Sequence, residues 1–299
     1  MTAVDVLVVG GGPSGLSAAT AAAEAGASVT LVDEWPALGG RLRYRQAQVA
    51  VGGRAFDPTE LVDALVGRAR AARVDLRRGT VAWSAFAGSR GLEVGIRGDG
   101  ASGEVSTPTR LILATGTTDR APIVPGTTLP GVITARALQI LLNLHGVRPG
   151  RRFAVLGDDR ADELVSDIES AGGEILRRVR SAELGDTAID GEGGVRGITC
   201  AGERTEVDIV VVALGTLPDT QIAGMLGCPF HSDGAWPPTP RRADDGSLGV
   251  PGVFACGSSA DVGSIEAAIL DGARVGRGRA DESADTAFAV GLAGGGVTG

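Results

Sequence analysis

Residues 4–34 of this 299-residue chain have the sequence VDVLVVGGGPSGLSAATAAAEAGASVTLVDE. The apolar run at residues 6–9 is typical of a strand that is buried on both faces of a parallel sheet. The alanine-rich segment that follows predicts a helix as far as Ala25, where Gly26 ends it. A second strand is predicted at residues 28–32, so the stretch has the complete strand–helix–strand pattern of a nucleotide-binding unit.

The turn between the first strand and the helix carries glycines in the spacing G-x-G-x-x-G. We expect Gly10 to make the tight turn, Gly12 to let the backbone approach a pyrophosphate, and Gly15 to let the helix pack on the strand. The helix N-terminus presents unpaired N–H groups and a partial positive charge to the phosphates. Asp33 ends the second strand, where a carboxylate accepts hydrogen bonds from ribose hydroxyls. A lone glycine-rich turn is a weak signal, but this combination predicts a dinucleotide site.

The next segment, DEWPALGGRLRYR, indicates which dinucleotide binds. Gly39 and Gly40 predict a second close approach of the backbone, which fits a cofactor with a longer body than NAD. Arg41 lies where its side chain can face the phosphates of that cofactor. A solvated, charged strand explains Arg41, Arg43 and Arg45 equally well, so both interpretations stay open.

Two later strands end in small residues beside this site. A predicted strand at residues 111–113 leads into Ala-Thr-Gly at residues 114–116, which lets the chain leave the sheet close to the cofactor. A second stretch predicts a short strand at residues 253–256, a turn at Gly257 and a helix capped by Ser264. A helix that starts there would direct its N–H groups at the carbonyl edge of a flavin ring and stabilise negative charge in the reduced flavin.

The strand–helix–strand pattern occurs a second time, at residues 153–156, 161–171 and 207–212. We therefore predict an α/β fold with two Rossmann-like nucleotide-binding units of the three-layer ββα/βα type. The first unit is split in sequence around the second. The predicted boundaries are 1–119 and 236–280 for the first unit, 120–235 for the second, and 281–299 for a flexible tail.

The second unit has acidic residues where a nucleotide fold has glycines. Its register is Gly157, Asp159 and Asp162, and Asp158 and Glu163 add two more carboxylates. Like charges ~4 Å apart cost roughly 4 kcal/mol at an effective dielectric near 20, whereas a helix dipole returns only ~0.3 to 1 kcal/mol. We therefore interpret the acids as caps of the helix N-terminus rather than as a metal site, and we do not expect this unit to bind NAD(P).

No catalytic residue can be recognised from spacing. His145 lies near a predicted helix end, where a cation offsets the dipole, and His231 lies in a loop that we expect nearer the cofactor. Arg177, Arg178 and Arg180 have the composition of a 2′-phosphate clamp. Without a pyrophosphate seat we interpret them as a solvated charged face.

Composition excludes several classes of function. The formal net charge is −8, which disfavours nucleic acid and anionic membranes as partners. Every cationic side chain is an arginine, so a Schiff-base mechanism is excluded. No apolar run reaches the ~18 to 20 residues of a membrane span, and the N-terminal residues resemble a strand, not a signal peptide. The cysteines show neither metal-ligand nor disulfide spacing, which indicates buried thiols in a reducing cytoplasm: Cys200, Cys228 and Cys256.

Four motifs resemble the two-domain FAD-dependent pyridine nucleotide-disulfide oxidoreductases in the compact layout of thioredoxin reductase. They are GGGPSG with Asp33, ATG at 114–116, ALGTLPDT at 213–220 and GVFACG at 252–257. Thioredoxin reductase itself is excluded, because the second unit has no paired cysteines to relay electrons to a disulfide. The resemblance covers residues 1 to about 280 and implies FAD in the first unit.

Longer stretches resemble the FAD-binding subunit of hydrogen cyanide synthase, opine oxidase and heteromeric sarcosine oxidase: DEWPALGGRLRYR, LPGVITARALQILLNLHGVRPGRR and LGCPFHSDGAWPP. This resemblance implies an FAD-dependent oxidoreductase that acts on C–N bonds of amines or amino acids. It also implies that the partner is a second, amine-oxidising flavoprotein subunit. The residues predicted to bind FAD are Gly10, Gly12, Gly15, Asp33, Glu34, Gly40, Arg41, Val81, Ala114, Thr115, Gly116, Gly257, Ser258 and Ile265.

The sequence departs from that family in two further places. Family members usually have an aspartate after GVFACG that binds the ribityl chain of FAD, and Ser258 stands there instead. Many members continue into a cysteine-rich iron–sulfur module, whereas this sequence ends in GLAGGGVTG, so we expect no cluster. Two alternatives stay open: a stand-alone NAD(P)H-dependent ferredoxin or quinone reductase, and a non-catalytic assembly subunit.

Overall fold

The computed structural model describes residues 2–98, 100, 102–158, 162–231, 239–260, 262–278, 287–288 and 291–292. The chain forms two compact units. The first consists of Met1–Arg43, Gln48–Thr117 and Pro218–Gly299, and the second of Tyr44–Ala47 and Thr118–Leu217. Most of the tail predicted at residues 281–299 lies outside the described residues.

The first unit is built on a seven-stranded sheet in the order β5-β2-β1-β8-β7-β6, with β18 also paired to β8. Alternate side chains of β1 enter two different hydrophobic clusters, Val6 and Val8 on one face of the sheet and Leu7 and Val9 on the other. Both faces of this strand are therefore buried, as its continuous apolar run predicts. The parallel strands are β1 (Thr2–Val9), β2 (Val29–Asp33), β5 (Asp75–Arg78), β8 (Glu104–Leu113) and β18 (Val253–Ala255), and the antiparallel ones are β6 (Thr80–Gly88) and β7 (Gly91–Gly98).

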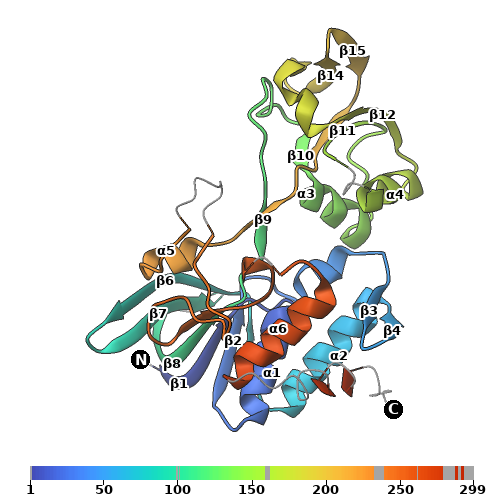
Figure 1. The fold of residues 1–299 in the computed structure, drawn as a ribbon. Coiled ribbons are helices and arrows are strands. Elements are labelled where there is room, and N and C mark those ends of the chain that lie inside the picture. Colours follow the sequence, from blue (N-terminus) through green and yellow to red (C-terminus); the bar gives the residue numbers. More distant parts are fainter. Residues whose placement is uncertain are drawn as a thin grey trace. The chain divides into compact units, whose positions relative to one another are not determined.

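The longer helices described in the first unit are α1 (Pro13–Glu24), α2 (Pro58–Ala71) and α6 (Ile265–Arg277). Helices α1 and α6 lie side by side although they are far apart in sequence (Figure 1). A Cβ atom at Gly272 would lie 2.2 Å from the Ser14 carbonyl oxygen, and one at Gly276 would lie 2.2 Å from the Ala18 carbonyl oxygen. Only glycine permits this approach of the two backbones. Ser264 caps α6, as predicted, by accepting a hydrogen bond from the Ala267 N–H at 3.1 Å.

The predicted boundary at residue 235 is wrong, because the second unit ends at Leu217. Helix α5 (Gln221–Met225) belongs to the first unit, where Ile222, Leu226 and Cys228 pack in the same cluster as Leu7 of β1. Apolar periodicity predicts that such residues are buried, but not against which sheet. The remaining short elements of this unit are β3 (Val49–Val51), β4 (Arg54–Phe56) and the 3₁₀ helices Gly40–Tyr44 and Gly257–Ala260.

The second unit repeats the plan on a smaller parallel sheet in the order β10-β16-β11-β12. The predicted repeat corresponds to β11, α4, β12 and β16, and the last strand begins at Ile209 rather than at residue 207. A three-stranded antiparallel sheet, β13-β14-β15, completes the unit. The bounds are β10 (Val132–Thr134), α3 (Ala135–Gln139), a π-helix at Ile140–Leu144, β11 (Arg152–Leu156), α4 (Asp162–Ser170), β12 (Glu174–Val179), a 3₁₀ helix at Ser181–Asp186, β13 (Thr187–Gly191), β14 (Val195–Cys200), β15 (Glu203–Glu206) and β16 (Ile209–Val212). Strands β9 (Thr117–Asp119) and β17 (Thr216–Pro218) pair with each other.

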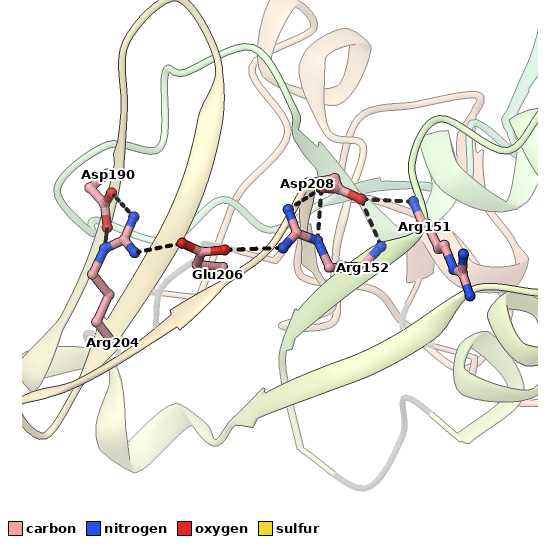
Figure 2. A network of polar contacts seen from close by, with 6 residues as sticks. All are labelled: Arg151, Arg152, Asp190, Arg204, Glu206 and Asp208. Carbon is pink, nitrogen blue, oxygen red and sulfur yellow. Dashed lines mark hydrogen bonds and ion pairs between the residues drawn. The ribbon is translucent and has the colours of Figure 1, made fainter.

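A polar network joins the strands of the second unit (Figure 2). Asp208, just before β16, accepts hydrogen bonds from the backbone N–H groups of Arg151 at 3.0 Å and Arg152 at 2.9 Å. The Arg152 guanidinium also donates to this carboxylate, at 2.8 Å and 3.1 Å. These bonds, the Arg152 side chain first, lower the pKa of Asp208 to about 2. Arg152 also forms an ion pair with Glu206. Glu206 in turn pairs with Arg204, which pairs with Asp190 on β13.

Candidate functional site

The glycine-rich turn of the first unit has three glycines with different surroundings. Gly10 has a φ of +109°, and a Cβ there would lie 2.2 Å from the Ala114 carbonyl oxygen. A Cβ at Gly15 would lie 1.9 Å from the Gly10 carbonyl oxygen. At Gly12, by contrast, the nearest atom to an added Cβ is Gly40 Cα at 3.9 Å. Packing within the chain therefore requires glycine at Gly10 and Gly15, while Gly12 borders open space, as a position reserved for close approach of a ligand does.

Helix α1 begins at this turn without any side-chain cap. Gly12 is its N-cap residue, Pro13 is its first residue, and its first turn contains no acidic side chain. In α2, the Asp57 side chain accepts from the Thr59 N–H at 2.8 Å. The first N–H groups of α1 are thus left for an anion, which the helix dipole also favours.

Asp33 lies beside the turn and is held by it. Its Oδ2 accepts a hydrogen bond from the Gly11 N–H at 2.5 Å, and its Oδ1 accepts from the Trp35 N–H at 2.8 Å. Burial raises the pKa of Asp33 above its ordinary value, although these two N–H groups and the Arg43 charge act against the shift. Arg43 lies over the exposed Trp35 ring, 5.6 Å from its centroid. The carboxylate is fixed in orientation and retains lone pairs for further donors.

The second pair of glycines packs directly on the first turn. The Gly39 N–H donates to the Gly11 carbonyl at 2.8 Å. Gly40 has a φ of +53°, and a Cβ there would lie 3.0 Å from Gly12 Cα. The charged strand considered for the following arginines is wrong, since Gly40–Tyr44 forms a 3₁₀ helix. Arg41 is exposed there, and Arg45 pairs with Glu163 at 3.2 Å.

The ends of β8 and β18 reach the same turn. The Ala114 N–H donates to the Val9 carbonyl at 2.8 Å. The Thr115 hydroxyl donates to the Asp219 carbonyl at 2.9 Å, and Gly116 accepts from the Asp219 N–H at 3.0 Å. The structure therefore brings the ATG motif together with the ALGTLPDT motif, and it commits the Thr115 hydroxyl to the backbone.

Gly257 fits closely against helix α1. It has a φ of +70°, and a Cβ there would lie 2.5 Å from Ser14 Cβ. Its N–H donates to Asp271 Oδ2 at 2.9 Å. Ser258 follows in the 3₁₀ helix Gly257–Ala260. Asp271 was missed by the sequence analysis, because it lies fourteen residues after Gly257 within a helix, with no motif of its own.

The other predicted FAD residues are less closely connected with the turn. Glu34 is exposed, Ile265 is half-buried at the start of α6, and Val81 is 44% exposed on β6. The backbone carbonyl of Trp35, a residue that was not predicted to lie at the site, accepts a hydrogen bond from the Gly79 N–H at 3.0 Å. Gly79 directly precedes β6. At the N-terminus of α6, Glu266 accepts from the Gly52 N–H at 2.8 Å.

In the second unit the corresponding turn has the opposite arrangement of charge. The Gly157 N–H donates to the Val179 carbonyl at 2.8 Å, as the Gly10 N–H does to Val32. By this register Asp158 takes the place of Gly11, and Arg180 takes the place of Asp33. The Asp158 carboxylate accepts from the Ser181 N–H at 3.0 Å and from its hydroxyl at 2.6 Å, which lowers its pKa.

The predicted role of these acids at the helix N-terminus needs correction for Asp158, whose described hydrogen bonds come from Ser181. Asp162 and Glu163 do lie in the first turn of α4, and Asp162 also pairs with Arg178 at 3.4 Å. Asp159 lies outside the described residues. Within the described part of the chain, no group of three or more histidine, cysteine or acidic residues has the geometry of a metal site.

The remaining candidates fall in different places. His145 ends the helix at Ile140–Leu144, and His231 borders a pocket of the first unit. The cysteines are buried free thiols, and burial raises the pKa of Cys256 to about 12. None of the described helices is long and apolar enough to cross a membrane.

Comparison with known proteins gives consistent matches. Residues 5–87 match the family model of FAD dependent oxidoreductases. The A subunit of opine oxidase from Agrobacterium tumefaciens (strain Ach5) is 27% identical over 90% of this chain and 63% of its own length. The alpha subunit of sarcosine oxidase from Corynebacterium sp. (strain U-96) is 33% identical over 70% of this chain but only 24% of its own length. This chain thus spans less than two thirds of either relative.

Solved structures confirm the predicted fold class. The L-proline dehydrogenase from P. horikoshii superimposes with a TM-score of 0.83 over 98% of this chain and 59% of its own, at 23% identity. Thioredoxin reductase is also among the structures with this fold. The resemblance to the opine and sarcosine oxidase subunits, predicted from motifs alone, is confirmed.

Proposed function

We propose that this chain is the FAD-binding subunit of an enzyme that oxidises C–N bonds, because residues 5–87 match the FAD dependent oxidoreductase family model and the chain is similar to subunits of opine oxidase and sarcosine oxidase. Its substrate class is amines, amino acids or imino acids, and its partner is a second flavoprotein subunit. We also propose a cytoplasmic location, since its buried cysteines are free thiols.

The observation that carries the FAD assignment is the open space at Gly12. An added Cβ at this position would meet only Gly40 Cα, at 3.9 Å, between two turns that are otherwise tightly packed. The uncapped N-terminus of α1 supplies N–H donors for a pyrophosphate, and Asp33 supplies an acceptor for ribose hydroxyls. FAD, when bound, supplies two-electron redox chemistry. The chain's own residues bind and orient it.

Two considerations support the proposed substrate class and partner. The relatives are named as subunits of opine oxidase and sarcosine oxidase, which supports amines or amino acids as the substrate class. Each relative is also named as one subunit of its enzyme, which supports a multi-subunit assembly. The charge arrangement in the second unit argues against NAD(P)H as reductant, since Asp158, in the place of Gly11, adds a carboxylate to the turn that would receive a nucleotide's anionic phosphates.

An anaerobic absorbance spectrum tests this proposal. The purified chain is mixed with FAD, passed through a desalting column and titrated first with NADH and then with NADPH. We expect a retained flavin spectrum that neither nucleotide bleaches, and bleaching by a secondary amine only after the partner subunit is added. Prompt bleaching by NADH or NADPH would instead establish the stand-alone reductase, and a chain that retains no FAD would favour the assembly subunit.

A further inference from the structure

A polar pocket of about 360 Å³ lies in the first unit, and none of its described lining residues belongs to the glycine-rich turn. Its walls come from the loop before β18, the 3₁₀ helix after it and helix α6, and they include Arg242, Asp244, Ser259 and Arg274. His231 stands at its border, where the His231 N–H donates to the Thr239 carbonyl at 3.0 Å. We call this the Arg242 pocket. Its volume is in the range of pockets that hold small molecules.

The two arginines of the pocket are held in place by one buried carboxylate. Asp271 Oδ1 accepts from Arg242 Nη2 at 2.5 Å and from Arg274 Nη2 at 2.7 Å. Arg242 Nε also donates to the Ala255 carbonyl at 3.0 Å, and Arg274 Nη1 donates to the Asp244 carbonyl. The side-chain exposure is 18% for Arg242, 23% for Arg274 and 9% for Asp271. Both guanidinium groups are therefore preorganised, with little conformational entropy left to lose on binding.

The charges in this cluster do not balance. Two guanidinium groups share the single buried carboxylate of Asp271, so these three side chains together carry one positive charge, which the exposed Asp244 at the pocket offsets in part. In the described part of the chain each of these guanidinium groups donates two hydrogen bonds, and a guanidinium has five N–H groups. Unused donors that are rigid, cationic and partly desolvated match the planar or tetrahedral oxygens of an anion.

Asp244 limits what can bind. It is an exposed residue of the pocket lining, so its negative charge repels an anion there. A ligand of low charge with one oxyanion group is therefore favoured over a polyanion such as a nucleoside triphosphate.

We propose that the Arg242 pocket binds a small ligand through one oxyanion group, a carboxylate or a phosphate, clasped by Arg242 and Arg274. None of the described residues that line the pocket is among those predicted to bind FAD. The other oxygen of Asp271 accepts from the Gly257 N–H, so the cluster is fixed on both sides of its carboxylate.

The test is a titration of the purified full chain at low ionic strength with acetate and, separately, with inorganic phosphate. Binding is followed by isothermal titration calorimetry and by the Nε–Hε signals of the arginine side chains. We expect saturable, one-to-one binding of at least one probe, with Arg274→Gln weakening it about tenfold or more, as loss of a charge-assisted hydrogen bond does. Asp244→Asn should change affinity in the opposite direction, by roughly two- to fivefold, because it removes a repulsive charge.

Arg241→Gln is the matched control, since Arg241 is exposed in the same loop and the substitution removes the same charge one residue away. It should change affinity by less than about twofold. Binding of acetate alone would identify a carboxylate ligand, and binding of phosphate alone would identify a phosphoryl ligand. Either result supports the site. If Arg274→Gln fails to fold, the expected gain in affinity of Asp244→Asn still tests the proposal. The proposal is overturned if neither probe saturates by roughly 20 mM, or if Arg241→Gln weakens binding as much as Arg274→Gln.

Discussion

Replacing Gly12 with alanine separates the fold of the glycine-rich turn from its proposed use. Gly12 has a φ of −75°, which alanine adopts without strain, and its added Cβ would meet only Gly40 Cα at 3.9 Å. As an N-cap, alanine is less favourable than glycine by roughly 0.5 to 1 kcal/mol, but alanine also restricts the unfolded chain more than glycine does, which stabilises the fold by about 0.4 to 1 kcal/mol. We therefore expect the free energy of unfolding to change by less than about 0.5 kcal/mol.

The same methyl group should weaken FAD binding strongly. It occupies the space through which a pyrophosphate approaches the backbone, and forcing one extra carbon into a filled site costs about 1 to 3 kcal/mol. At about 1.4 kcal/mol per tenfold change, this predicts a loss of roughly 5- to 150-fold in affinity. Flavin fluorescence on titration with the apoprotein measures the affinity, and urea unfolding measures the stability.

Gly67→Ala is the matched control, because Gly67 lies within α2 and a Cβ there meets nothing within 4 Å. It should leave FAD affinity unchanged. If Gly12→Ala binds FAD as tightly as the unaltered chain, the open space at Gly12 does not face the cofactor and the reasoning fails. If Gly12→Ala unfolds the first unit, the turn has an internal role that its geometry does not show.

Asp33→Asn should reduce FAD affinity about tenfold, through loss of a charged acceptor. In the unaltered chain, acidification should release FAD above pH 3.8, since burial raises the pKa of Asp33 above that ordinary value; a flavin-release titration checks both expectations. Asp208→Asn should destabilise the second unit at pH 7. The pKa of Asp208 is lowered from 3.8 to about 2, so its stabilisation is complete above pH 3.8 and is lost as pH falls through 2. The pKa shift corresponds to about 2 kcal/mol at most, and solvent screening of a side chain that is 35% exposed reduces the expected effect to about 1 kcal/mol. Urea unfolding should show a difference in free energy of unfolding between Asp208→Asn and the unaltered chain at pH 7 but not at pH 2. Asp158→Gly should not create NADH-dependent bleaching, because Arg180 still replaces the acid that accepts hydrogen bonds from the ribose hydroxyls of NAD; bleaching of the flavin by NADH in stopped-flow absorbance would show that Asp158 alone blocks this nucleotide.

Local sequence predicted the first turn well, because its requirements are local. The roles of Gly10 and Gly15 follow from a fixed spacing within one strand–turn–helix unit. The acids of the second turn were also visible, but their partner was not. Asp158 bonds to Ser181, which lies 23 residues further along, so only the paired ends of β11 and β12 bring the two together.

Contacts among distant segments could not be predicted. The cluster around Asp271 joins residues of a loop, a strand end and a helix, and its charged members Arg242, Asp271 and Arg274 lie outside every motif recognised in the sequence. The domain boundary near Leu217 failed for a related reason. The apolar spacing of Ile222 and Leu226 predicts burial, while the choice of sheet depends on tertiary packing.

The pairing of α1 with α6 has a consequence for synthesis on the ribosome. Helix α1 ends at Glu24 and α6 begins at Ile265, so the partner that Gly272 and Gly276 bring to α1 is translated late. At ~5 to 20 residues per second, the interval is roughly ten to fifty seconds. Nearly all of the second unit emerges as one uninterrupted segment, Thr118–Leu217, within that interval. A nascent chain paused after Leu217 should therefore contain a protease-resistant second unit, while its first unit still lacks α6 and remains sensitive to protease.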